Sequence, residues 1–195
     1  MIALSSVLGK TFHLILSQRL STFLTENKLI DNSVQKAFLR KINGTIEHNQ
    51  SIQEVLLHAR ANRRTAHLTF FDLEDAFGSV QHNLISHCLN RYKVPLQSSH
   101  TNSRFLLFTI PKIHCKNLYQ NLNGTVVTKH WSSEKFVFKK GVFQGDPLSP
   151  IVFLVIFNPL LERLQMEQNF GYKINNFSYL TTPFADDFNL SLIHI

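Results

Sequence analysis

Three aspartates are the residues of this sequence whose type and spacing could support metal chemistry. Asp186 and Asp187 are adjacent at a bend between apolar runs, and Asp72 ends a strand-like run over residues 66–72. Two carboxylates at such a bend repel each other and lose hydration, which costs stability unless a cation binds there. Because an isolated Asp-Asp pair is more often a solvated turn, the hypothesis needs the third carboxylate.

Asp72 lies 114 and 115 residues before the two members of the pair. If the strands that carry them are neighbours in one sheet, the three carboxylates come together and offer oxygen ligands to two hard divalent cations. Two ions about 3.5–4 Å apart can activate an attacking hydroxyl and stabilise a leaving pyrophosphate. The residues alone therefore predict metal-dependent phosphoryl or nucleotidyl transfer.

The composition restricts the class of protein. The 195 residues are 44% hydrophobic and 17% charged, which is sufficient for one substantial core. The net charge of +7 and the pI near 9.6 favour an anionic partner such as nucleic acid, although a generally basic protein has the same composition. Cys88 and Cys115 have no metal-ligand spacing, and we expect reduced thiols. We find no signal peptide, and the longest apolar run is too short to span a bilayer, so we expect a soluble intracellular protein without a membrane partner.

Periodicity predicts helices that alternate with short strands. Helices are expected over residues 7–24, 45–62, 81–91 and 149–165. Strands are expected over residues 66–72, 125–128 and 136–138 and on both sides of the Asp186-Asp187 bend, with a turn at Asn123-Gly124 and a polar connector over residues 169–177. Residues 96–110 follow no clear pattern.

Helical spacing also predicts which side chains face the core. The first helix should begin after Ser5 or Ser6 and bury Phe12, Ile15, Leu16, Leu20, Phe23 and Leu24. The second should direct Ile46, Ile52, Leu56 and Leu57 broadly inward, and the third should bury Leu84, Ile85, Cys88 and Leu89. The helix over residues 149–165 is apolar on most sides and should be buried, with Pro150 in its first turn.

Three motifs resemble consecutive motifs of reverse transcriptases, in the order and near the spacing of that family. They are Phe71-Asp72-Leu73-Glu74-Asp75-Ala76-Phe77-Gly78-Ser79-Val80, then Gln144-Gly145-Asp146-Pro147-Leu148-Ser149-Pro150, then Phe184-Ala185-Asp186-Asp187. The residues of these motifs are most similar to those of reverse transcriptases of non-LTR (LINE-like) retrotransposons. Residues 2–10 also resemble a stretch of that family. The resemblance covers nearly the whole chain, and three motifs in order are far more specific than one.

The resemblance implies roles for individual residues. Asp72 and Asp186 match the two metal-binding aspartates of the family, and Asp187 matches the supporting member of the pair. Phe77 matches the bulky residue that excludes a ribose 2′-hydroxyl, although without the motif it would be an ordinary core aromatic.

Other matching positions surround the incoming dNTP. Asp75 and Ala76 match positions whose backbone passes near the triphosphate, and Gln144 and Gly145 match the segment that contacts the nucleotide and the template. Asp146 is expected to cap the following helix rather than to bind metal.

Basic residues outside the motifs could contact the nucleic-acid backbone. They are Arg63, Arg64, Lys139 and Lys140, which no motif fixes. The two arginines could equally complement the C-terminal dipole of the preceding helix.

The resemblance implies an α+β fold with a polymerase palm, an antiparallel sheet backed by helices, and partial helical fingers. Residues 1–64 and 92–140 would form the fingers, and residues 65–91 and 141–195 the palm. The family carries a basic arginine-containing segment before the stretch that opens this sequence, and a lysine-bearing motif and a helical thumb after the aspartate pair. We therefore expect a reverse transcriptase domain truncated at both ends.

The implied function is RNA-directed DNA synthesis with an RNA template, a DNA primer and dNTPs. Two Mg²⁺ ions, with Mn²⁺ as a possible substitute, would serve the reaction. We expect the truncated chain to be weakly active or inactive alone. Two alternatives stay open, namely a non-catalytic nucleic-acid-binding relic and an intron-encoded or bacterial retroelement enzyme.

Overall fold

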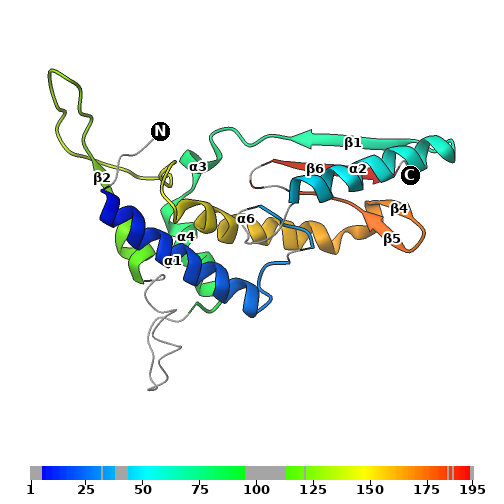
Figure 1. The fold of residues 1–195 in the computed structure, drawn as a ribbon, viewed down its shortest axis with the longest axis horizontal. Coiled ribbons are helices and arrows are strands. Elements are labelled where there is room, and N and C mark those ends of the chain that lie inside the picture. The colour runs from blue at the N-terminus through cyan, green and yellow to red at the C-terminus, as the bar shows by residue number, and fades with distance from the viewer. Residues whose placement is uncertain are drawn as a thin grey trace. The chain divides into compact units, whose positions relative to one another are not determined.

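The computed structural model describes residues 6–31, 33–37, 44–94, 113–120, 122–183, 185 and 187–193 (Figure 1). The chain divides into two compact units. The first unit comprises residues 1–27 and 75–156, and the second unit comprises residues 28–74 and 157–195. The expected irregular stretch at residues 96–110 lies outside the described residues.

The first unit consists mainly of helices. They are α1 (Val7–Glu26), α3 (Ala76–Ser79), α4 (His82–Arg91), a helical segment over residues 113–120 and the first part of α6 (Ser149–Met166). Ser6 is the N-cap of α1, since its hydroxyl accepts a hydrogen bond from the Gly9 N–H at 3.1 Å, which confirms the predicted start. Strand β2 (Asn123–Gly124) pairs antiparallel with β3 (Phe136–Val137).

The second unit contains α2 (Gly44–Ala61), the rest of α6, a short 3₁₀ turn (Gln168–Phe170) and two antiparallel strand pairs. Strand β1 (Ala66–Phe71) pairs with β6 (Phe188–Ile193), and β4 (Tyr172–Ile174) pairs with β5 (Phe177–Tyr179). In Figure 1, β1 and β6 run side by side as one long ribbon with α2 beside it. Helices and antiparallel pairs within one chain confirm the α+β class.

The core of the second unit shows which face of α2 is buried. Val55 and Ala59 pack against Tyr172, with Ala66, Ile174 and Tyr179 around them. His48 is buried on the same face of the helix. The prediction that Ile46, Leu56 and Leu57 point inward is wrong, because each of them is at least half exposed. The polar residue His48 belongs to the inner stripe, and hydrophobic periodicity alone therefore selects the wrong face.

Four further predictions need correction. Phe12 and Ile15 of α1 are exposed, whereas Leu16, Leu20 and Leu24 are buried, and Leu84 of α4 is exposed beside buried Ile85, Cys88 and Leu89. The expected connector at residues 169–177 contains β4, because Asn175 adopts a left-handed conformation that closes a tight hairpin. The expected turn at Asn123-Gly124 is instead a short strand, since both residues pair with β3.

Cys88 and Cys115 are buried, and no helix among the described residues is long and apolar enough to cross a membrane.

Helices α2 and α4 end in the same way. In α4 the Val94 N–H donates to the Leu89 carbonyl at 3.0 Å, and the Lys93 N–H donates to the Asn90 carbonyl at 2.9 Å. This is a Schellman motif, and its left-handed position is occupied by Lys93 with a φ of 52°. Arg63 holds the equivalent position after α2 with a φ of 50°.

We expect Lys93→Gly to stabilise the chain by about 0.5–1 kcal/mol, because glycine adopts a left-handed conformation without the steric penalty of a Cβ. The gain corresponds to a rise in Tm of roughly 1–4 °C for a chain of this size. Lys93→Ala is the control, since it removes the charge but keeps the Cβ. Equal Tm changes for the two variants would contradict the steric cost that we assign to a Cβ at this left-handed position.

Candidate active site

The pairing of β1 with β6 brings the predicted aspartates together. The register is antiparallel and places Phe71 opposite Phe188. Asp72 directly follows β1 and Asp187 directly precedes β6, so the two residues lie at the same end of the strand pair. The expectation that neighbouring strands carry the carboxylates is confirmed for these two residues.

Asp72 and Asp187 line one cavity in the second unit, with a volume of about 400 Å³. The strands contribute Phe70, Phe71 and Asn189 to its wall, Thr182 lies beside them, and α2 contributes Thr45, His48, Asn49 and Ile52. We call this space the aspartate cavity. The end of β1 that lines this cavity is less buried than expected. Phe70 is 68% exposed, and Asp72, which follows the strand, is also exposed. The half-buried part of the strand lies at Ala66 and Leu68, where α2 and β4 pack.

The donor atoms of the aspartate cavity suit a hard cation. Asp72 and Asp187 offer carboxylate oxygens, the preferred ligands of Mg²⁺. None of the ion pairs among the described residues involves either carboxylate. Within the described part of the chain no group of three His, Cys, Asp or Glu side chains could hold a metal ion. Asp186, the remaining member of the predicted set, lies outside the described residues.

A second cavity of about 200 Å³ lies in the first unit and collects the other motif residues. It is lined by Asp75, Phe77, Gly78, Leu122, Phe138, Lys140, Gly141, Val142, Phe143 and Gln144. We call it the nucleotide cavity, for the role that the resemblance predicts. Phe77 is half-buried and stacks on Phe153 of α6, with ring centroids 5.2 Å apart and planes 19° apart. Its ring is thus held from behind at the wall of the cavity.

Backbone contacts explain how residues near Phe77 meet residues near Gln144. The Val142 N–H donates to the Phe77 carbonyl at 2.8 Å, and the Gly141 N–H donates to the Val80 carbonyl at 2.6 Å. Gly141 has a φ of 97°, and an added Cβ would lie 3.1 Å from the Gly78 carbonyl oxygen. Glycine is therefore required at this crossing. These contacts bring together two motifs that are about 65 residues apart in the chain.

The remaining predicted residues are dispersed. Ala76 is buried at the start of α3, while Gly145 is exposed and left-handed, with a φ of 94°. Arg63, Arg64 and Lys139 are exposed and line neither of the two cavities, whereas Lys140 lines the nucleotide cavity.

Comparison with known proteins decides the family. The profile of the family described as reverse transcriptase (RNA-dependent DNA polymerase) matches residues 1–192. The chain belongs to the reverse transcriptase family. It is 30% identical over 186 residues to the retrovirus-related Pol polyprotein of the type-2 retrotransposable element R2DM of Drosophila melanogaster. It is 28% identical over 186 residues to the Pol polyprotein of the type-1 element R2 of Nasonia vitripennis. Both relatives come from R2 elements, which confirms the non-LTR type.

This chain spans only a small part of the length of these two relatives. Each of the two alignments covers 95% of this chain and 16% of the polyprotein. Among solved structures, telomerase of Candida tropicalis in complex with a fragment of telomeric RNA is similar, with a TM-score of 0.62 at 16% identity. That match covers 92% of this chain and 28% of the telomerase chain. Telomerase of Candida albicans gives a TM-score of 0.60 at 14% identity, and these likenesses establish the polymerase fold.

Asp146 of the second motif is a structural residue, as its position before α6 predicts. Its Oδ1 accepts a hydrogen bond from the Leu148 N–H at 2.8 Å, and its side chain is buried. Its Oδ2 lies 2.5 Å from Nδ1 of His13, whose Nε2 lies 2.8 Å from Nε2 of His114. The negative charge of Asp146 also contributes, after burial, to raising the pKa of Cys115 to about 12. Sequence reasoning missed the two histidines, because isolated histidines on helices give no spacing signal.

We expect Asp146→Ala to lower the free energy of unfolding by about 2–4 kcal/mol, because it removes the acceptor for the Leu148 N–H and leaves Nδ1 of the half-buried His13 ring without its Asp146 partner. Asp146→Asn is the matched variant, since it keeps an oxygen for the Leu148 N–H and should cost less. Denaturant unfolding measures both. A change of less than 0.5 kcal/mol for Asp146→Ala would contradict the structural role, by the usual size of surface substitutions.

Proposed function

We propose that this chain carries the catalytic centre of an RNA-directed DNA polymerase, which adds dNTPs to a primer 3′-hydroxyl by two-metal nucleotidyl transfer. The observation that carries the proposal is the β1–β6 register, which brings Asp72 and Asp187 to one cavity in a chain of the reverse transcriptase family. Asp72 and Asp186 would hold the ions, and Asp187 would support them. Two Mg²⁺ ions, or Mn²⁺ in their place, would when bound neutralise the charge that develops on the attacking and leaving oxygens.

The residues of the nucleotide cavity would orient the incoming dNTP. Phe77 would lie under the sugar and exclude a 2′-hydroxyl, because its ring is held by the stack on Phe153 and cannot easily retreat. Gln144 and Gly145 would contact the nucleotide and the template, and the backbone at Asp75 and Ala76 would pass near the triphosphate. Lys140 lies at the same cavity and offers a positive charge to a phosphate. Catalysis by positioning needs little proton transfer by side chains.

An RNA template and a DNA primer are the proposed macromolecular partners. The net charge of +7 favours them, and Arg63, Arg64, Lys139 and Lys140 are exposed and able to face a phosphate backbone. The assignment of residues 1–64 and 92–140 to partial fingers, and of residues 65–91 and 141–195 to the palm, stays part of this proposal.

Primer extension on an RNA template with dNTPs and Mg²⁺ tests the function. We expect weak incorporation by the chain, reduced at least about a hundredfold in Asp72→Asn and in Asp186→Asn, because several kcal/mol of charge stabilisation depend on the metal ligands. Glu134→Gln is the control, since it removes an exposed carboxylate that lines neither cavity. Template–primer binding with a steep salt dependence but no Mg²⁺-dependent incorporation would instead favour the nucleic-acid-binding relic.

Discrimination between dNTPs and rNTPs tests Phe77. We expect Phe77→Val to raise the ratio of rNTP to dNTP incorporation by about tenfold or more, because the smaller side chain leaves room for a 2′-hydroxyl. Phe143→Val is the matched control, since Phe143 lines the same cavity outside the predicted sugar position. An unchanged ratio in Phe77→Val, or an equal rise in Phe143→Val, would remove the proposed role.

A further inference from the structure

Two buried residues before Asp187, namely Pro183 and Ala185, contact side chains from other parts of the chain through their backbone groups. We call Pro183, Ala185 and Asp187 the aspartate turn. The hairpin starts with an isolated bridge between Thr181 and Leu190, and the Thr182 N–H lies 3.3 Å from the side-chain oxygen of Asn189. Beyond that point Pro183 and Ala185 are buried. Buried backbone carbonyl and N–H groups need hydrogen-bond partners, and here the partners are side chains from outside the hairpin.

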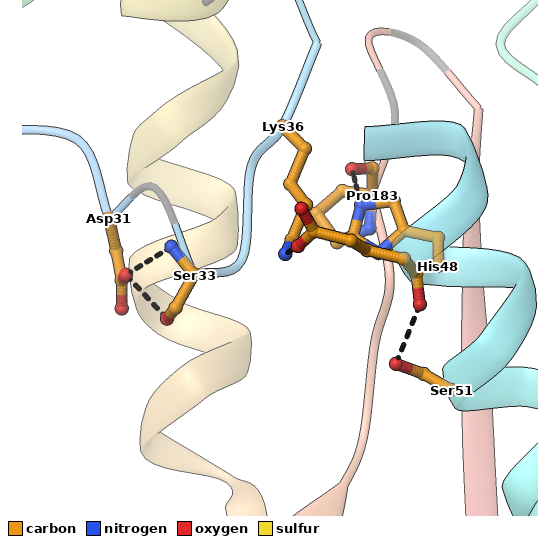
Figure 2. A network of polar contacts seen from close by, with 7 residues as sticks. Asp31, Ser33, Lys36, His48, Ser51 and Pro183 are labelled. Atoms are coloured by element: carbon orange, nitrogen blue, oxygen red, sulfur yellow. Dashed lines mark hydrogen bonds and ion pairs between the residues drawn. The ribbon is translucent and has the colours of Figure 1, made fainter. Parts of the chain in front are cut away.

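His48 of α2 provides the first partner. Its Nε2 lies 2.9 Å from the Pro183 carbonyl oxygen, and its side chain is buried (Figure 2). A carbonyl can only accept, so His48 must donate from Nε2–H. Burial lowers the pKa of His48, which favours a neutral ring with its proton on Nε2. His48 also lines the aspartate cavity, next to Asp72 and Asp187.

Gln35 provides the second partner. Its Oε1 accepts hydrogen bonds from the Ala37 N–H at 2.9 Å and from the Ala185 N–H at 3.4 Å, and the residue is 1% exposed. Ala185 has a φ of 59°, a left-handed conformation that is unfavourable for a residue other than glycine. Such a conformation persists only where the surroundings impose it. The Gln35 contact is one of the surroundings that do so.

The segments that carry these two residues are tied to each other. Lys36, next to Gln35, forms an ion pair with Glu47, next to His48 (Figure 2). Earlier in the segment, Asp31 Oδ1 accepts hydrogen bonds from the Ser33 N–H at 2.8 Å and from the Ser33 hydroxyl at 2.5 Å. The ion pair holds Lys36 against the first turn of α2, so Gln35 and His48 reach the turn from two segments that contact each other.

We propose that His48 and Gln35 are positioning residues, which hold the backbone of the aspartate turn and so set the place of the Asp187 carboxylate relative to Asp72. The metal-binding part of this inference rests on the proposed function. A role in packing alone does not explain the glutamine. The buried Gln35 Nε2 finds no acceptor among the described residues, which costs stability. A methionine would fill the same space without a buried unpaired nitrogen.

The first experiment measures the turn directly and needs no metal. Amide hydrogen exchange of Ala185 and the backbone chemical shift of Asp187 are recorded by NMR for the full chain and its variants. We expect at least tenfold faster Ala185 exchange in Gln35→Met and in His48→Leu. His48→Gln should restore most of the protection, because its side-chain amide nitrogen can donate from nearly the same place. His58→Leu is the matched control, since His58 lies on the same helix but contacts the Tyr172 hydroxyl at 3.1 Å.

The second experiment measures metal affinity. Mn²⁺ binding is followed by electron paramagnetic resonance, and the specific site is defined as the binding lost in Asp72→Asn. We expect His48→Leu and Gln35→Met to weaken this binding about tenfold, while His48→Gln and His58→Leu stay within twofold of the parent chain. Should His48→Leu fail to fold, His48→Gln and Gln35→Met still decide the result.

The outcomes separate the two proposals. Unchanged Ala185 exchange in Gln35→Met and His48→Leu, or an equal change in His58→Leu, overturns the positioning role. Faster exchange with unchanged Mn²⁺ affinity overturns its link to the metal site. A parent chain without an Asp72-dependent Mn²⁺ site overturns the proposed function, and the exchange data then still decide whether His48 and Gln35 hold the turn.

Discussion

The antiparallel pairing of β1 with β6 joins two parts of the chain that are more than a hundred residues apart, and the candidate metal site depends on it. The pairing brings Asp72 and Asp187 to the wall of one cavity, where like-charge repulsion opposes it. Backbone hydrogen bonds along six residue pairs and the packing of α2 and β4 against the other end of β1 offset that repulsion. The strand is therefore half-buried where it is stabilised and exposed where its carboxylate lies.

Each of the two units holds one cavity that is lined by motif residues. The second unit holds the aspartate cavity, whose oxygen ligands suit hard cations. The first unit holds the nucleotide cavity, where hydrogen bonds between residues 77–80 and 141–142 bring two motifs together. Among the described residues, the aspartate cavity is lined by two carboxylates and no lysine or arginine, whereas the nucleotide cavity is lined by Lys140 as well as Asp75 and the Phe77 ring.

Buried polar side chains recur at the motif segments of this reverse transcriptase. Asp146 accepts from the Leu148 N–H and contacts His13, while His48 and Gln35 contact the backbone of the aspartate turn. Asp146 contacts a backbone group two residues away, whereas His13, His48 and Gln35 come from segments that are distant in the sequence. These side chains supply hydrogen bonds to polar groups of segments that follow an irregular path. This is a physical reason for polar residues at positions that packing alone would fill with apolar ones.

The sequence by itself determined the family, the α+β class and most helix limits, because these depend on local signals. The cap at Ser6, the strand just before Asp72 and the apolar helix that begins at Ser149 are all readable from neighbouring residues. The sequence did not determine that β4 exists or that Phe12 and Ile46 are exposed. It also did not determine that the side chains of His13, His48 and Gln35 contact the motif segments by hydrogen bonds. Those features depend on which distant surfaces meet. A histidine on a helix looks the same in the sequence whether it faces solvent or a buried carbonyl, and only the tertiary structure decides between them.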